Sequence, residues 1–209
     1  EICACLVGSE MCIRDSYKAV FVGSGAGLPM FMNIPGESLK GVLSANEYLT
    51  RTNLMKAYTE EADTPVIKSK AVAVVGGGNV AMDAARSARR MGAKSVKIVY
   101  RRRRADMTAL AEEIDGAIED GCELMELVAP AHVEVNDEGH AVALWGQPQM
   151  ISTVRGGRPS PKAANKPEVR IPATTIIVAI GQNIDSSAFE EFGLPCKWNE
   201  IQAQPDSSI

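Results

Sequence analysis

The sequence has little of what several protein classes require. Only 5% of its 209 residues are aromatic, and only two residues are histidine. The five cysteines include no C-x-x-C pair, and their odd number argues against both a disulfide framework and a dithiol redox centre. We therefore expect a protein of the cytoplasm, where thiols stay reduced.

Long hydrophobic runs and an excess of positive charge are also missing. The longest apolar stretches, residues 71–75 and 175–180 with their neighbours, are far too short to cross a bilayer. Lys and Arg number 22 against 26 for Asp and Glu, which gives a formal net charge of −4. A membrane partner and a nucleic-acid partner are therefore not expected. With 45% hydrophobic and 23% charged residues, the composition is that of a globular protein.

Residues 1–16 differ from the rest of the chain. They show no regular hydrophobic period and lack the basic region and long apolar core of a secretory signal. Residues 5–16 resemble translated sequencing-adaptor DNA. We predict that residues 1–16 are a non-native segment. The C-x-C-x6-C spacing inside it would then carry no metal, because no fourth ligand lies nearby.

The middle of the chain alternates between strand and helix patterns. Apolar runs at residues 70–75, 95–100 and 122–128 predict strands, and residues 79–91 and 108–120 predict the helices between them. This order is typical of a parallel α/β sheet.

The flanking segments add further elements. A short strand is expected at residues 17–22, and a helix at 44–58 with Ser44 as its N-cap. Residues 131–135 and 141–154 alternate as an antiparallel hairpin. Residues 155–172, rich in Gly, Pro and Lys, are expected to form a loop, and 175–180 a further buried strand.

A glycine-rich motif of the form G-x-G-x-x-A follows the first predicted strand of the α/β series and opens a helix. It comprises Gly76, Gly77, Gly78, Asn79, Val80 and Ala81. In such a motif the first glycine allows the tight turn and the second lets a pyrophosphate approach the backbone, while the alanine permits close packing of helix on strand. The pyrophosphate then lies at the positive end of the helix. The alternative is an ordinary glycine-rich turn that binds no ligand.

Four arginines, Arg101 to Arg104, follow the next predicted strand. A site for NAD carries an acidic residue there, but the first carboxylate is Asp106. Guanidinium groups suit the 2′-phosphate of NADP. We therefore predict that Arg101 and Arg102 bind this phosphate. A solvated charge run is the alternative, and for Arg103 and Arg104 it is the better interpretation.

Two more glycine-containing segments could line a cofactor or could be plain structural turns. The first contains Gly23 and Gly25. The second comprises Ala179, Ile180, Gly181 and Gln182. No nucleophile–base pair can be identified, so we predict no catalytic side chain and no metal site. Hydride transfer does not require a catalytic side chain, because its cofactors carry the chemistry.

The motifs together resemble those of the NADPH-dependent glutamate synthase small-subunit family of flavin-linked oxidoreductases. The matching segments are YKAVFVGSGAG (17–27), IPGE (34–37), SANEYL (44–49), VVGGGNVAMD (74–83), VYRR (99–102) and TIIVAIGQ (175–182). Relatives include dihydropyrimidine-dehydrogenase-type flavoproteins.

The resemblance implies a Rossmann-like three-layer NADPH-binding domain, residues 65–174, inserted into a FAD-binding domain. Residues 17–64 and 175–209 would belong to the FAD side, and the loops at Gly23, Gly25, Gly181 and Gln182 would approach the flavin. It further implies hydride transfer from NADPH to FAD and onward transfer to an iron–sulfur domain or partner subunit.

The family's first FAD-binding glycine motif and its later Gly-Gly-Asp segment have no counterpart in the sequence, and Thr108 stands where relatives usually have proline. We therefore expect an internal fragment that is inactive alone. The competing hypotheses are a regulatory module that binds a dinucleotide without redox chemistry and, last, a dithiol reductase.

Overall fold

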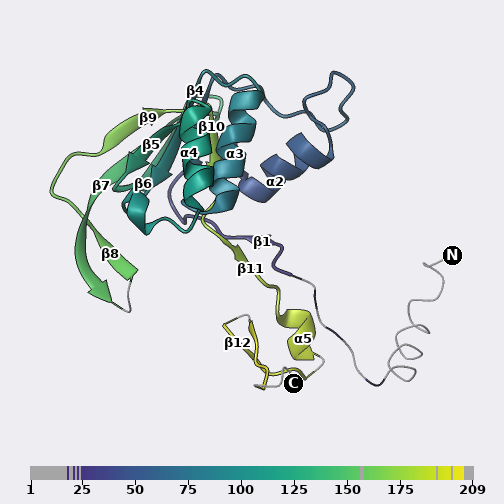
Figure 1. Ribbon diagram of the computed structural model, residues 1–209. Coiled ribbons are helices and arrows are strands. Elements are labelled where there is room, and N and C mark those ends of the chain that lie inside the picture. Colours follow the sequence, from purple (N-terminus) through teal and green to yellow (C-terminus); the bar gives the residue numbers. More distant parts are fainter. Residues whose placement is uncertain are drawn as a thin grey trace. The chain divides into compact units, whose positions relative to one another are not determined.

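The computed structural model describes residues 18, 21, 23, 25–155, 158–191, 193–198 and 200–204. The chain divides into two compact units (Figure 1). The larger unit is Leu28–Asn183, and the smaller combines Glu1–Gly27 with Ile184–Ile209. The predicted segment 1–16 lies outside the described residues, as does most of the strand expected at 17–22.

A five-stranded parallel sheet forms the centre of the larger unit, in the order β2-β10-β3-β4-β5. Its strands are β2 (Val42–Ser44), β3 (Ala71–Val75), β4 (Ser95–Tyr100), β5 (Glu123–Glu126) and β10 (Thr175–Val178). β3 reads AVAVV and β10 reads TIIV, so apart from Thr175 both are apolar, as expected of strands covered on both faces. The predicted parallel α/β sheet is confirmed.

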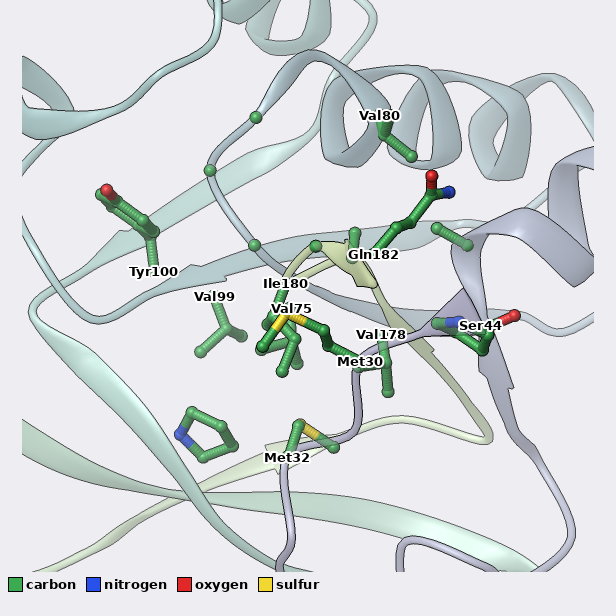
Figure 2. A pocket seen from close by; sticks show the side chains of 18 of the residues that line it. Met30, Met32, Ser44, Val75, Val80, Val99, Tyr100, Val178, Ile180 and Gln182 are labelled. Atoms are coloured by element: carbon green, nitrogen blue, oxygen red, sulfur yellow. The ribbon is translucent and has the colours of Figure 1, made fainter. Parts of the chain in front are cut away.

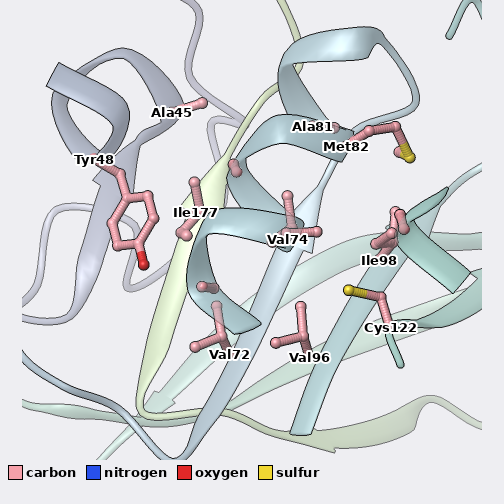
Figure 3. Close-up of a cluster of buried hydrophobic side chains, with 14 of the residues drawn as sticks. Ala45, Tyr48, Val72, Val74, Ala81, Met82, Val96, Ile98, Cys122 and Ile177 are labelled. Carbon is pink, nitrogen blue, oxygen red and sulfur yellow. The ribbon is translucent and has the colours of Figure 1, made fainter. Parts of the chain in front are cut away.

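Helices cover one face of this sheet (Figures 1 and 3). They are α2 (Ala45–Leu49), the π-helical turn η1 (Thr50–Leu54), α3 (Asn79–Arg90) and α4 (Ala111–Glu119). A further 3-10 turn, η2 (Arg104–Asp106), follows β4 and has no buried residue. The buried face of α3 is mostly alanine, with Ala81, Ala84 and Ala85 fully buried. Small side chains let α3 lie close to Val74 and Ile98 of the sheet.

Antiparallel strands cover the other face, and they complete the predicted three-layer, Rossmann-like fold. They are β6 (Val128–Val135), β7 (Ala141–Arg155), β8 (Arg158–Ala163) and β9 (Val169–Pro172). Leu144 and Ile171 of this layer pack with Val75, Val99 and Ile176 of the central sheet in a second apolar core.

Three predicted boundaries need correction. Residues 155–172 are not a loop, because β8 and β9 each pair with the long strand β7. β8 lies at the edge of its sheet, where prolines without an N–H are tolerated. The helix expected at 44–58 ends at Leu54, and the one expected at 108–120 begins only at Ala111.

The chain enters and leaves the larger unit along one antiparallel pair. β1 (Leu28–Pro29) and β11 (Gln182–Asn183) are hydrogen-bonded to each other, with Leu28 opposite Asn183. In the smaller unit the structure describes α5 (Ser187–Glu191) and the pair β12 (Cys196–Lys197) and β13 (Glu200–Ile201). No helix among the described residues is both long and apolar enough to span a bilayer.

Candidate functional site

A cleft of about 750 Å³ lies at the carboxyl ends of β3, β4, β10 and β2 (Figure 2). This volume falls in the range of small-molecule and cofactor sites. The sequence-predicted residues that line it are Gly76, Gly77, Gly78, Asn79, Val80, Arg101, Arg102, Ala179, Ile180, Gly181 and Gln182. The predicted residue Ala81 is instead fully buried under the first turn of α3.

The first two positions of the β3–α3 turn require glycine, because neighbouring parts of the chain pack closely against the backbone there. Gly76 has φ +150°, and a Cβ there would lie 2.3 Å from the backbone oxygen of Ala179. A Cβ on Gly77 would lie 2.5 Å from the ring of Tyr100. These two positions therefore bring the turn against both β10 and β4.

Gly78 has a different environment because it opens toward the cleft. It caps α3 with no side-chain hydrogen bond, and the nearest atom to a Cβ there would be the Thr108 hydroxyl oxygen, 3.5 Å away. The first N–H groups of a helix have no partner in the preceding turn, and they carry the positive end of the helix dipole. This end of α3 is therefore accessible to an anion.

The segment that leads into α4 holds the glycine turn in place. The carbonyl oxygen of Gly77 accepts the N–H groups of Thr108 and Ala109, each at 3.0 Å. The Asn79 side-chain oxygen accepts the N–H of Leu110 at 2.9 Å. These bonds explain why α4 starts later than its sequence pattern suggests. They also show that the Asn79 oxygen already has a partner within the chain.

Two of the four arginines line the cleft. Arg101 is exposed there, and in the described part of the chain its guanidinium makes neither an ion pair nor a hydrogen bond. The Arg102 Nε donates to the backbone oxygen of Pro159 in β8 at 2.7 Å, so the antiparallel layer positions this side chain.

The other two arginines are held by carboxylates. Arg103 Nε lies 2.8 Å from Asp106 Oδ2, and hydrogen bonding to this guanidinium lowers the pKa of Asp106 below its usual value. Arg104 pairs with Asp115. The first carboxylate after β4 is therefore engaged by Arg103 and does not line the cleft.

The β10–β2 end of the cleft is built from amides and apolar side chains. The Gln182 amide nitrogen donates to Asn46 Oδ1 of α2. The predicted N-cap of this helix, Ser44, is confirmed, because its hydroxyl oxygen accepts the N–H of Glu47 at 3.1 Å. Met30 reaches this end because its N–H donates to Gly181 O at 3.0 Å. Asn46 and Met30 were not predicted as site residues. The rule that ligands gather at the carboxyl ends of parallel strands was the available signal for Asn46.

The remaining predicted residues lie elsewhere. Gly23 and Gly25 belong to the smaller unit, so their part in the site stays a prediction. Cys122 is buried as expected, and burial raises the pKa of its thiol to about 11. Across the described ranges no three His, Cys, Asp or Glu side chains gather as metal ligands.

Comparison with known proteins places this geometry in context. The chain is 32% identical to the glutamate synthase (NADPH) small chain of Escherichia coli K12 over 187 residues, which is 84% of this chain and 39% of that protein. It is 35% identical to the NADP(+)-dependent formate dehydrogenase subunit beta of Moorella thermoacetica over 182 residues, 84% of this chain and 24% of that one.

The fold has counterparts among solved structures. Mycobacterium tuberculosis FprA in complex with NADPH superimposes with a TM-score of 0.70 at 18% identity, covering 94% of this chain and 56% of that chain. The chain spans between 24% and 46% of the length of eight curated relatives that it matches. The family model described as pyridine nucleotide-disulphide oxidoreductase matches residues 10–208. The chain therefore belongs to the pyridine nucleotide-disulphide oxidoreductase family.

Proposed function

We propose that the cleft binds NADP(H) and that the chain is part of a flavin-linked oxidoreductase similar to the small chain of glutamate synthase. One observation carries the proposal. The uncapped start of α3 and the unpaired Arg101 open into the same cleft, while the first carboxylate after β4 is engaged by Arg103.

The residues present fit NADP(H) at two points. The free N–H groups after Gly78 would hold the pyrophosphate, in a space that a Cβ on this glycine would enter. Arg101 and Arg102 would bind the 2′-phosphate through charge-assisted hydrogen bonds. An unmodified ribose would lack its usual carboxylate acceptor at the end of β4. When bound, NADPH supplies a hydride, and the chain's own contribution is binding and orientation.

We also propose the domain arrangement that the sequence indicates. Residues 65–174 would form the NADPH domain, between two segments, 17–64 and 175–209, that belong to a FAD-binding domain. The antiparallel pairing of β1 with β11 supports an insertion, because it brings the chain that enters Leu28–Asn183 beside the chain that leaves it. The compact unit, Leu28–Asn183, is wider than 65–174 because β2 and β10 pair within the same sheet as β3.

A partner is part of the proposal. Relatives are named as a small chain or a subunit beta, which supports a larger assembly that receives the electrons. An iron–sulfur domain or subunit would be the acceptor, and the cytoplasm would be the compartment.

Calorimetric titration of the purified chain tests the binding. NADPH should bind, and NADH should bind at least about tenfold more weakly, because it lacks the phosphate that the arginines contact. Equal affinity for the two nucleotides would contradict the assignment of Arg101 and Arg102. The redox role is tested in the longest natural protein that contains this sequence. NADPH should reduce its flavin, whereas binding without flavin reduction would favour a regulatory module.

A further inference from the structure

We propose that Asn46 and Gln182 act as a pair that recognises a primary carboxamide, and that the carboxamide is that of the nicotinamide ring. The inference rests on the proposed NADP(H) site and assigns the half of the ligand that the glycine turn and the arginines do not contact. The two amides would then distinguish a carboxamide from other substituents on the pyridine ring.

The pair forms through the sheet although its members are 136 residues apart. Val178 of β10 pairs with Ser44 of β2, so the segments that follow these strands emerge together at the same edge. There the Gln182 amide nitrogen donates to the side-chain oxygen of Asn46.

The hydrogen-bonding groups left over are complementary to a carboxamide. The bond between the two residues leaves the Gln182 carbonyl as an acceptor and the Asn46 NH2 group as a donor. If both amides were rotated by half a turn, one carbonyl and one NH2 group would still be left. A primary carboxamide offers one NH2 group and one carbonyl, so both of its sides can be satisfied at once.

Strand order places this pair on the correct side of the cleft. β10 and β4 flank β3 on opposite sides, and the arginines follow β4. A dinucleotide with its pyrophosphate at the start of α3 and its 2′-phosphate beyond β4 must extend its other half over β10 and β2. β2 lies two strands from β3, about 10 Å away at ordinary strand spacing.

The surroundings of the pair are apolar and carry no charge, which suits a neutral carboxamide and, in NADPH, a neutral ring. Val80, Ile180 and Met30 line this part of the cleft, and each keeps about two fifths of its surface exposed. In Figure 2, Gln182 projects toward the space between the start of α3, at Val80, and the end of β2, at Ser44. Among the described residues that line the cleft, Arg101 and Arg102 are the only charged ones. The amide end is therefore suited to a neutral polar group.

The test compares three ligands by calorimetry on the 209-residue chain. They are NADP+, 2′-phospho-ADP-ribose, which lacks the nicotinamide ring, and the 3-acetylpyridine analogue of NADP+, which keeps the carbonyl but has no NH2 group. Asn46→Ala and Gln182→Ala should each weaken NADP+ about three- to tenfold and leave 2′-phospho-ADP-ribose unchanged. Wild type should prefer NADP+ to the acetylpyridine analogue. The variant that removes the accepting carbonyl should lose that preference; this is Gln182→Ala or, with both amides rotated, Asn46→Ala.

The outcomes separate this inference from the function on which it rests. Asn53→Ala removes an exposed amide of η1 outside the cleft and should change neither affinity. Equal losses for NADP+ and 2′-phospho-ADP-ribose in the two variants would overturn the inference and leave the NADP(H) site standing. Equal affinity of wild type for NADP+ and its acetylpyridine analogue would overturn it without any variant. If wild type bound none of the three ligands, the proposed function itself would fail.

Discussion

The two ends of the cleft use different chemistry at the same edge of one sheet. At the β4 end, an unpaired guanidinium on Arg101 and a second one positioned by Pro159 present positive charge. At the β10–β2 end, the Asn46–Gln182 pair and apolar side chains present no charge. The comparison shows that neighbouring strands of one sheet can give the two ends of a cleft different charge.

The glycine turn between these ends is shared, and Gly76→Ala should have the largest effect of all. The new Cβ would meet the backbone oxygen of Ala179 at a positive φ, so β10 must move. We expect a loss of more than about 3 kcal/mol in the free energy of unfolding, measured by urea denaturation. Gly92→Ala is the matched control, because its φ is +98° but the space around it is open, and it should cost about 1–3 kcal/mol. Equal costs would show that β10 does not restrict the turn.

Gly78→Ala should instead weaken binding at both ends of the cleft, because both depend on a pyrophosphate held at the start of α3. A Cβ at this position fits the free protein but fills the approach to the N–H groups of α3. The melting temperature should change little, while NADPH, NADH and 2′-phospho-ADP-ribose should all weaken by at least about a hundredfold. Unchanged binding of these ligands would place the pyrophosphate elsewhere.

Arg101→Ala should affect the charged end alone. Loss of one charge-assisted contact is worth about 1.5–3 kcal/mol, so NADPH should weaken roughly ten- to a hundredfold while NADH is nearly unaffected. Arg102→Ala should act in the same direction. Arg104→Ala is the matched control, because Arg104 is paired with Asp115 and should change the affinity for NADPH by less than about twofold. Equal weakening of NADPH and NADH would rule out phosphate recognition by these arginines.

Glu134→Gln, a substitution outside the cleft, should leave nucleotide binding at both ends unchanged and alter only the pH dependence of stability. Hydrogen bonds from Arg170 and then from Trp145 lower the pKa of Glu134 from 4.5 to about 2. Because the folded pKa is depressed, this stabilisation is present above about pH 4.5 and is lost as the pH falls toward 2. In thermal melts, the advantage of wild type over Glu134→Gln should therefore shrink over that range. A constant difference, or a loss of NADPH affinity at neutral pH, would contradict this assignment.

The sequence was most informative where structure depends on neighbouring residues. The parallel α/β order and the Ser44 cap follow from local patterns of apolar residues, glycines and a hydroxyl, and the structure reproduces them. The turn at Gly76 to Gly78 was identified for the same reason.

Long-range pairing was less accessible from the sequence. Residues 158–163 read as a loop because prolines and charges dominate them, yet pairing with β7 makes them an edge strand. The contact of Asn46 with Gln182 depends on β10 lying beside β2, which no local pattern indicates. Likewise, the separation of Arg101 from Arg103 depends on the carboxylate of Asp106, whose orientation only the folded chain defines.

The position of β10 between β2 and β3 has a consequence for synthesis on the ribosome. β2 and α2 emerge early, but β2 cannot pair with β3, because the strand that separates them is made after β3, β4 and β5. A nascent chain can therefore form the glycine turn and α3 while β2 is still unpaired. Pairing β2 with β10 then closes a long loop, which has an entropic cost. The two amides meet only when β10 enters the sheet, so the cleft is completed in the last step of assembling that sheet.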